Sequence, residues 1–343
     1  MKKYYIIITL ISGLAMWQCS RTDSELSLKQ SIENGVAKIN VALSKISETK
    51  GYQLMTVTDD ATKSDEEFND SITLDLVAGI YEFQPQTFIC HHSKQPFWLY
   101  KKTGESDMMI VNLPQRMVFH PKFMYYMNLP DTAAKNDFSI IASDYHFYYS
   151  WWNHYDYKLK AGFLLDSKDI GTLDVLAAGD SFSDRSYSSE FTFTDDYSVK
   201  VLHESGDTST SSFALMKGDE TLLGETAVFI RKESHKREKQ YTLSIGKVDI
   251  VRTTGIDSIQ VFLDGVLQKT AAAKITDTDE SGSICHHRDL LLTYDDGTTA
   301  KLSELIEPAM TTLKTLVGSM HSMYFAQHVV DHIALSIYYY RIN

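Results

Sequence analysis

The residues with the clearest chemical potential are two Cys-His-His triplets, Cys90-His91-His92 and Cys285-His286-His287. Thiolates and imidazoles are ligands that suit zinc or copper, so the triplets could meet at one metal ion. However, adjacent residues of a strand point to opposite faces, and zinc ligands are normally two to four residues apart. In an oxidising compartment a disulfide between Cys90 and Cys285 is the simpler arrangement, with two free buried thiols as the alternative. We therefore expect a disulfide, worth about 4–5 kcal/mol in the chain-entropy model, and no metal or cofactor.

The segment Gly179-Asp180-Ser181-Phe182-Ser183 resembles the nucleophile block of GDSL-type hydrolases. That chemistry needs the serine between a strand and a helix, with a histidine three residues beyond an aspartate near the C-terminus. Here Ser181 lies mid-chain among β segments, and Asp331 and His332 are adjacent. The segment therefore indicates a hairpin turn, and a hydrolase is only a remote alternative. No catalytic residue is predicted.

An aromatic cluster, Tyr148, Trp151, Trp152 and Tyr155, is the third candidate. Flat rings stack on the apolar faces of sugars, so the cluster could form a platform that binds glycans. Large rings are also core material, and the four could instead fold back onto a sheet at the end of a hairpin. Exposed indoles would favour the platform, and buried indoles would exclude it.

These candidates fall within a long β region, Phe138–Leu302. In it, Phe191 and Phe193 alternate with threonines, a period of two that buries one face of a strand and leaves the other wet. Turn residues such as Asp264-Gly265 separate the alternating segments, with no helical spacer between them. We predict a mainly β fold, a long antiparallel meander curled by its twist into a barrel, a half-barrel or a sandwich.

A helix is expected to pack on this sheet at each end of the chain. Ser27 and Gln30 form a capping box at the start of the first helix. An apolar stripe follows at helical spacing: Ile32, Val36, Ile39, Leu43 and Ile46. Glu307-Pro308 favours the start of a second helix, because proline suits a first turn. His328–Tyr340 is ambiguous in its pattern, and a last strand such as Ile333–Tyr340 is the preferred interpretation.

The N-terminus, Met1–Cys19, has the features of an export signal, with Lys2-Lys3 ahead of an apolar segment too short to span a bilayer comfortably. Cys19 stands where a bacterial lipoprotein carries its acylated cysteine, although the three preceding residues are bulkier than usual. A lipid on Cys19 would tether the protein to a membrane leaflet; a plain secretory signal is the alternative.

The predicted organisation runs from a signal peptide to a C-terminal helix. Its parts are residues 1–18 (signal), 19–48 (tether and amphipathic helix), 49–70 (acidic linker), 71–302 (antiparallel β body) and 303–343 (C-terminal helix, with the last strand). The chain of 343 residues carries a net charge of −12, and removing the signal with its two lysines gives 31 − 45 = −14. Such a surface repels phosphate backbones, so no nucleic-acid partner is expected.

Several phrases resemble uncharacterised envelope lipoproteins of gut Bacteroidales, and the likeness covers most of the mature chain. The phrases are 101–107 (KKTGESD), 136–138 (NDF), 181–189 (SFSDRSYSS) and 256–261 (IDSIQV). They are turn and strand sequences, so the resemblance implies an outer-membrane lipoprotein of the cell envelope and carries over no activity and no site residue.

Together these patterns predict an extracytoplasmic, lipid-anchored, non-enzymatic binding or structural protein. Surface glycan binding through the aromatic platform is one specific alternative. Carriage of an apolar ligand in a β cavity is another, and assembly with an envelope protein is a third.

Overall fold

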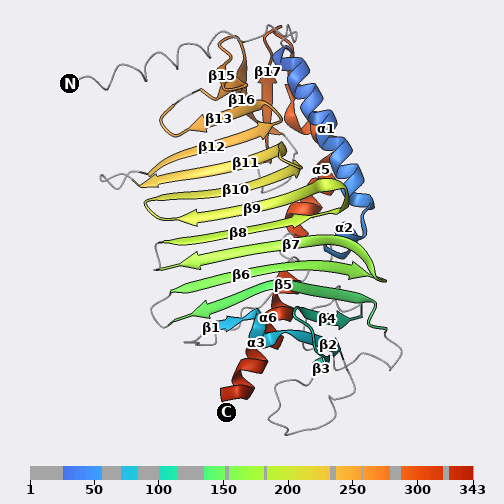
Figure 1. Ribbon diagram of the computed structural model, residues 1–343. Coiled ribbons are helices and arrows are strands. Elements are labelled where there is room, and N and C mark those ends of the chain that lie inside the picture. Colours follow the sequence, from blue (N-terminus) through green and yellow to red (C-terminus); the bar gives the residue numbers. More distant parts are fainter. Residues whose placement is uncertain are drawn as a thin grey trace, which may run out of the picture.

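A single large sheet dominates the computed structural model of the protein (Figure 1). The structure describes residues 26–55, 71–83, 100–114, 135–150, 154–180, 184–231, 237–256, 258–278, 287–319 and 324–342. Within them the sheet has 15 strands, and its strand order ends at β3 on one side and at β15 on the other. The predicted mainly β meander is therefore confirmed. The sheet is not closed into a barrel, so of the three predicted forms a half-barrel or a sandwich fits it.

The strands of the large sheet are β1 (Ser71–Thr73), β2 (Gly79–Phe83), β3 (Tyr100–Gly104), β4 (Met109–Leu113), β5 (Phe138–Tyr149), β6 (Tyr155–Leu165), β7 (Lys168–Gly179), β8 (Arg185–Thr192), β9 (Tyr197–Ser205), β10 (Thr208–Lys217), β11 (Glu220–Arg231), β12 (Arg237–Ile245), β13 (Val248–Thr253), β14 (Gln260–Leu263) and β15 (Val266–Leu267). A smaller sheet contains β16 (Ala272–Thr278), β17 (His287–Thr293) and β18 (Thr299–Lys301). The helices are α1 (Leu28–Glu48), α2 (Lys50–Met55), α3 (Leu74–Val77), α5 (Leu302–Ser319) and α6 (Tyr324–Ile342), and η3 (Thr194–Asp196) is a 3₁₀ turn.

Consecutive strands from β5 to β15 pair antiparallel through short turns, as the alternation and the turn residues predict. At the β14–β15 hairpin, Asp264 and Gly265 both have positive φ, 48° and 77°. Both angles suit a two-residue loop that follows the twist of the strands. The structure also departs from a pure meander. β2 pairs parallel with β4, and β16–β18 form a separate sheet.

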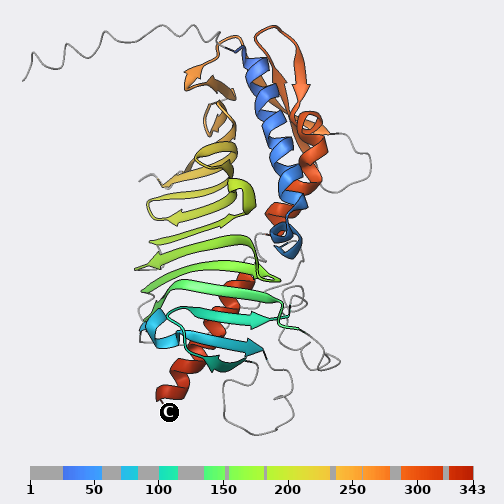
Figure 2. The same ribbon diagram turned by 45° about the vertical axis from the view of Figure 1, so that its right-hand side comes forward.

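Helix α1 forms as its sequence predicts. The Ser27 hydroxyl accepts from the Gln30 amide, and the Gln30 side chain accepts from the Ser27 amide. The stripe from Ile32 to Ile46 is buried, against α5 on one side and against β11, β12 and β13 on the other. Figure 2 shows α1 and α5 side by side, next to one half of the sheet. Gly35, which weakens an isolated helix, allows this approach: a Cβ there would lie 2.8 Å from Ile245 Cγ2.

Replacing Ser27 with alanine should lower the free energy of unfolding by about 1 kcal/mol, because the Gln30 amide loses its side-chain acceptor. Urea unfolding followed by circular dichroism measures the change. Ser44→Ala is the matched control. This serine is exposed inside the same helix, where alanine is the better helix former, so no loss is expected. Equal losses in the two variants would contradict the capping role.

The second helix begins earlier than predicted, at Leu302 rather than at Glu307-Pro308, so Pro308 lies in the second turn of α5. The reason is a contact distant in sequence. The Asp289 carboxylate of β17 accepts from the Ser303 amide at 3.2 Å and from the Ser303 hydroxyl at 2.5 Å. Burial alone raises the pKa of Asp289, but these two bonds, the Leu290 amide and the Lys301 charge outweigh it and lower the pKa. A charged carboxylate at a helix start also suits the helix dipole.

The predicted last strand at Ile333–Tyr340 is wrong, because this segment belongs to helix α6. Ile333, Leu335 and Ile337 alternate in sequence, yet the buried apolar positions are Phe325, Ala326, Val329, Val330, Ile333 and Ala334. The buried residues come in adjacent pairs, and successive pairs are four residues apart, which is the helical period. A half-buried strand would instead bury every second residue.

The acidic linker, residues 49–70, also needs a correction, because α2 occupies Lys50–Met55 and packs on β7. Residues 56–70, the signal peptide 1–18 and Cys19 lie outside the described residues. Among the helices that the structure does describe, none is long and apolar enough to cross a membrane.

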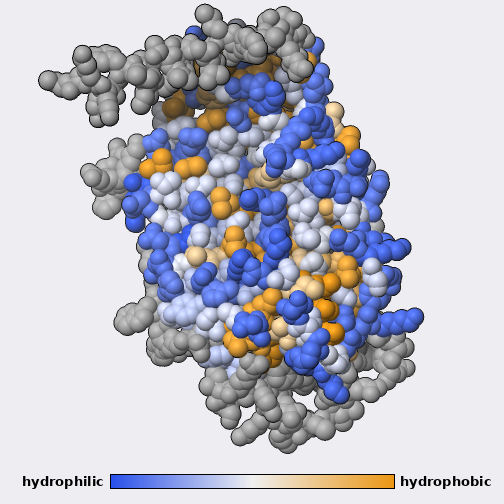
Figure 3. Space-filling view, viewed as in Figure 1, coloured by the Kyte–Doolittle hydropathy of each residue, from blue (hydrophilic) through white to orange (hydrophobic). Residues whose placement is uncertain are grey.

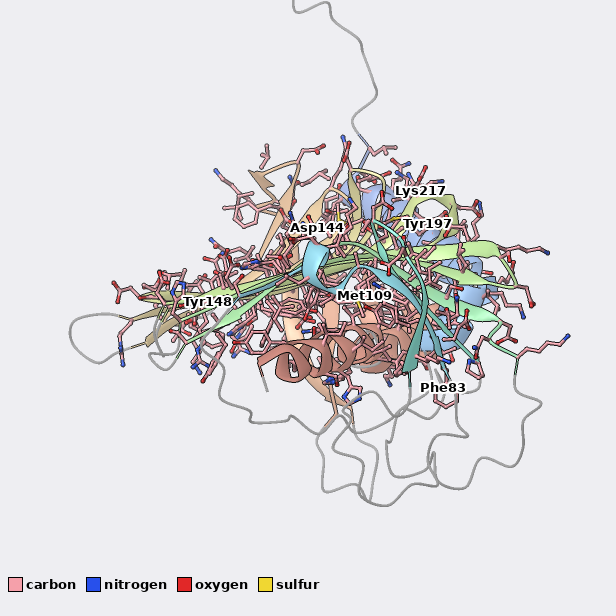
Figure 4. The ribbon with its side chains drawn as sticks, turned by 60° about the horizontal axis from the view of Figure 1, so that its bottom comes forward. Phe83, Met109, Asp144, Tyr148, Tyr197 and Lys217 are labelled. Atoms are coloured by element: carbon pink, nitrogen blue, oxygen red, sulfur yellow. The ribbon has the colours of Figure 1, made fainter. Side chains whose placement is uncertain are left out.

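The two faces of the large sheet differ. The inner face carries most of the buried strand residues; α1 packs against β11–β13, and α6 meets β5 and β6 on this face. In the end-on view of Figure 4, Met109 lies towards α6 and Asp144 lies on the opposite side. The outer face, seen in Figure 3, is largely hydrophilic with scattered apolar patches. Cross-strand ion pairs such as Lys158–Asp144 (2.5 Å) and Lys160–Asp174 (3.8 Å) lie on it. Exposed pairs of this kind contribute little to stability, so the inner face carries the fold.

Candidate functional site

The inner face is only partly covered. It is buried near the turns that lead into β9, β11 and β13. At the other end of the same hairpins, where β8, β10 and β12 begin and β9 and β11 end, it is half-exposed. These ends extend to the left of α1 and α5 in Figure 1. We call the half-exposed apolar residues there the open strip: Tyr187, Val201, Phe213, Ala227, Tyr241 and Leu243. Tyr187, Val201, Phe213 and Leu243 pack against the buried core, so the strip continues the core to the surface.

Strand register places the strip on the inner face. Buried Tyr157 pairs with Ala177, and Ala177 pairs with Tyr187, so all three share one side of the sheet. The same row continues through His203 and Ser211 to Ala227 and Tyr241. Tyr241 remains 43 % exposed and makes an edge contact with Phe229 at 6.0 Å between ring centroids. The strip is thus a band of rings and aliphatic groups that crosses five strands.

At its β8 end the strip includes a polar atom without a partner. Ser189, two residues from Tyr187 on the same face, is 1 % exposed, and its hydroxyl has no hydrogen-bond partner among the described residues. Exposed Glu225 and His203 lie within the same two rows of the sheet. The surface therefore offers mostly apolar contacts with a few polar groups, the composition typical of ligand sites.

Beyond Tyr187, the row enters a polar cluster beneath α6. Asp331 Oδ1 of α6 accepts from the Tyr145 hydroxyl at 3.0 Å and from the Tyr157 hydroxyl at 3.1 Å. The two tyrosines belong to β5 and β6, are 2 % and 5 % exposed, and pack edge to face. The Gln327 side chain, one helical turn before Asp331, also donates to the carboxylate.

The surrounding protein changes the acidity of this cluster. Burial raises the pKa of Asp331 to about 7, although hydrogen bonds from Tyr145, Tyr157 and Gln327 act in the opposite direction. Burial, followed by the nearby Asp331 charge, raises the pKa values of Tyr145 and Tyr157 well above 10. The tyrosines are therefore permanent donors, while the carboxyl exchanges its proton near neutral pH. Such a group can act as an acid or base, but titration by itself defines no reaction.

No family model, curated protein or solved structure matches this chain. The site must therefore be interpreted from its own residues.

The predicted aromatic platform is only partly described. Trp151 and Trp152 lie outside the described residues. Tyr148 pairs with Asp156, and its neighbour Tyr149 pairs with Tyr155, so Tyr148 and Tyr155 lie on opposite faces of the β5–β6 ribbon. Tyr148 contacts His154 on the outer side, and Tyr155 covers Gly179 on the inner side. The structure thus does not bring these two rings onto one surface.

The predicted disulfide cysteines, Cys90 and Cys285, lie outside the described residues, as does Ser181 of the remote hydrolase alternative. For Ser181 the flanking elements are informative. β7 ends at Gly179, and β8, which is antiparallel to it, begins at Arg185, whereas a nucleophile elbow requires a following helix. Among the described side chains, no group of three or more His, Cys, Asp or Glu residues could hold a metal ion.

Sequence reasoning noted Asp331 only as a mismatch to a hydrolase motif and missed its role in the cluster. A detectable signal exists: reading 324–342 as a helix places one acidic residue next to the buried positions Val330 and Ile333. A charged residue beside a buried helical stripe indicates a partner across the interface. Tyr145 and Tyr157 gave no such signal, because tyrosine is an ordinary strand residue.

Proposed function

We propose that this chain is a non-enzymatic binding protein of the cell envelope that holds an apolar chain on the open strip. The observation that carries the proposal is the half-exposed apolar surface that continues the core across β8–β12. Contiguous apolar surface left open on a folded protein marks an interaction site. An aliphatic or acyl chain suits it best, because the strip crosses five strands with mostly apolar side chains, beside the polar groups Glu225 and His203 of the same rows.

The open sheet determines the form that such binding would take. Because β3 and β15 do not pair with each other, the ligand would lie along a surface rather than inside a closed cavity. This replaces the enclosed β cavity considered from sequence. The lipid anchor on Cys19 and the outer-membrane location remain part of the proposal, and they rest on the N-terminal sequence.

Replacing Tyr241 with aspartate should weaken binding of N-phenyl-1-naphthylamine, a neutral apolar probe, by at least about tenfold, because a buried charge opposes contact with an apolar ring. Phe213→Asp should act in the same direction. The probe's fluorescence increase, titrated with the purified protein in detergent-free buffer, measures the affinity.

The matched control is Leu176→Asp, a change of the same kind at a 52 % exposed residue of the outer face. It should leave probe affinity unchanged. If the wild-type protein does not bind the probe, or if all three variants weaken binding equally, the open strip is not the site.

Glycan binding is the second candidate, carried by the aromatic composition of 148–155. It predicts retardation of the protein in polysaccharide affinity gels and loss of retardation in a Trp151→Ala, Trp152→Ala double variant. Unchanged mobility of the wild-type protein in such gels would exclude it.

A further inference from the structure

One carboxyl group connects α6 to the sheet. Asp331 is held by Tyr145 of β5 and Tyr157 of β6, residues more than 170 positions away in sequence. Around these bonds the contact is apolar, made by α6 residues such as Val330 and Ile333, which are 0 % and 1 % exposed. Hydrogen bonds set in an apolar interface depend strongly on whether their acceptor carries a charge.

Among the residues that the structure describes, few titratable groups lie around Asp331. From the sheet, Tyr145 and Tyr157 face it, and Tyr187 lies near Tyr157. Of the other elements packed on α6, β1 contains Ser71, Ile72 and Thr73, and α3 contributes Asp75, which is exposed and bonded to Thr73. On α6 itself, burial lowers the pKa values of His328 and His332. At neutral pH these histidines are therefore uncharged, and Asp331 is the group that changes its state.

The surroundings of Asp331 give a geometric reason for the neutral carboxyl to be preferred. Its hydrogen-bond donors are neutral: the hydroxyls of Tyr145 and Tyr157 and the side-chain amide of Gln327. No lysine or arginine among the described residues forms an ion pair with it. A carboxylate held in apolar surroundings without a counter-charge carries a desolvation cost that the neutral carboxyl avoids.

We propose that the proton on Asp331 is a latch that holds α6 against β5 and β6, and that its loss loosens α6. This inference rests on the proposed function, because the latch sets the length of the open strip. Tyr157 and Tyr187 share one row of the inner face, so a loosened α6 lengthens the strip by uncovering Tyr157 and Tyr145. The binding surface is then short in mildly acidic solution and longer in mildly alkaline solution.

Hydrogen exchange of α6 amides, expressed as protection factors at pH 6 and pH 8, tests the latch. With a pKa of about 7 in the attached state and 3.8 in the detached state, the opening equilibrium should rise about tenfold between these two pH values. Burial lowers the pKa values of His328 and His332 as well, and Asp331→Asn, which keeps both histidines, separates any contribution from them. Peptides from α1, whose buried stripe contains no acid, provide the internal reference.

Asp331→Asn should remove the pH dependence, and Asp174→Asn, which changes an exposed carboxylate of the outer face, should retain it. Tyr157→Phe removes a hydrogen bond that lowers the Asp331 pKa, so it should move the midpoint of opening to higher pH. If Tyr157 acted by packing alone, its replacement would change the protection factors of α6 without moving the pH midpoint of opening. This variant also keeps the test decisive if Asp331→Asn does not fold.

Two results would overturn the latch: equal α6 protection at both pH values in the wild-type protein, or the same pH dependence in Asp331→Asn. Probe titration at the same two pH values separates this inference from the proposed function. Probe binding with constant α6 protection refutes the latch alone. Absence of probe binding at both pH values refutes the open strip, and the exchange data still decide the latch.

Discussion

Replacing Gly171 with alanine should lower the free energy of unfolding by about 3 kcal/mol or more. Gly171 of β7 has a φ of 149°, a conformation that residues with a side chain rarely adopt. A Cβ there would lie 2.7 Å from the Thr192 carbonyl oxygen and 2.8 Å from the Phe191 ring. The Thr192 oxygen belongs to the backbone of the neighbouring strand, so it cannot move aside cheaply. Chemical denaturation monitored by tyrosine and tryptophan fluorescence measures the loss.

Gly162 of β6 is the matched control for this change. It pairs with Thr172, the residue after Gly171, and a Cβ added to it meets no atom within 4 Å. Gly162→Ala should therefore be neutral or stabilise the protein by about 0.5–1 kcal/mol, since alanine loses less conformational freedom than glycine on folding. Similar losses in both variants would show that β6 and β7 both disfavour a side chain at these positions, and that the approach of Thr192 is not the cause.

Replacing Asp331 with asparagine should stabilise the protein at pH 8 and change little at pH 4. The folded pKa of Asp331 is raised by burial, to about 7 from 3.8. Between pH 4 and pH 7 the folded chain therefore keeps a proton that the unfolded chain has released. Its contribution to stability is greatest below pH 4, falls as the pH rises towards 7, and is constant above 7. The full shift corresponds to about 4 kcal/mol, an upper limit because the side chain is half-buried.

Urea unfolding of the wild-type and Asp331→Asn proteins at each pH unit from 4 to 8 measures this difference. Subtracting the free energies of unfolding of the two proteins at each pH removes the contribution of groups common to both. Asp289 is one such group, and its lowered pKa stabilises the fold at higher pH. The difference should grow with pH between 4 and 7 and then stay level. A difference independent of pH would show that Asp331 titrates as an ordinary exposed aspartate.

Features that depend on local chain preferences are predictable from sequence. The alternation of Phe191 and Phe193 with threonines predicts one buried face, and both rings are buried, at 4 % and 2 % exposure. The turn at Asp264-Gly265 and the capping box of Ser27 and Gln30 also form as predicted, because each depends on residues within four positions of one another. The period of side chains along a strand and the φ preference of a turn residue are properties of the chain itself.

The helix boundaries show where local signals fail. Pro308 predicts a helix start, but the start is set by Asp289, which lies in another element and offers its carboxylate to the Ser303 amide. Ile333–Tyr340 is interpreted from sequence as a strand, but burial against β1 and α3 selects a helix. In both cases a contact distant in sequence outweighs a weak local preference.

The sequence by itself determined that this is a mainly β chain of antiparallel hairpins with an amphipathic helix before it, because alternation, turn residues and caps act over a few neighbouring positions. Only the tertiary structure decided that the sheet stays open, which part of its inner face the helices leave uncovered, and that Asp331 meets Tyr145 and Tyr157. The physical reason is that burial and the pKa of a carboxyl depend on atoms brought close by folding.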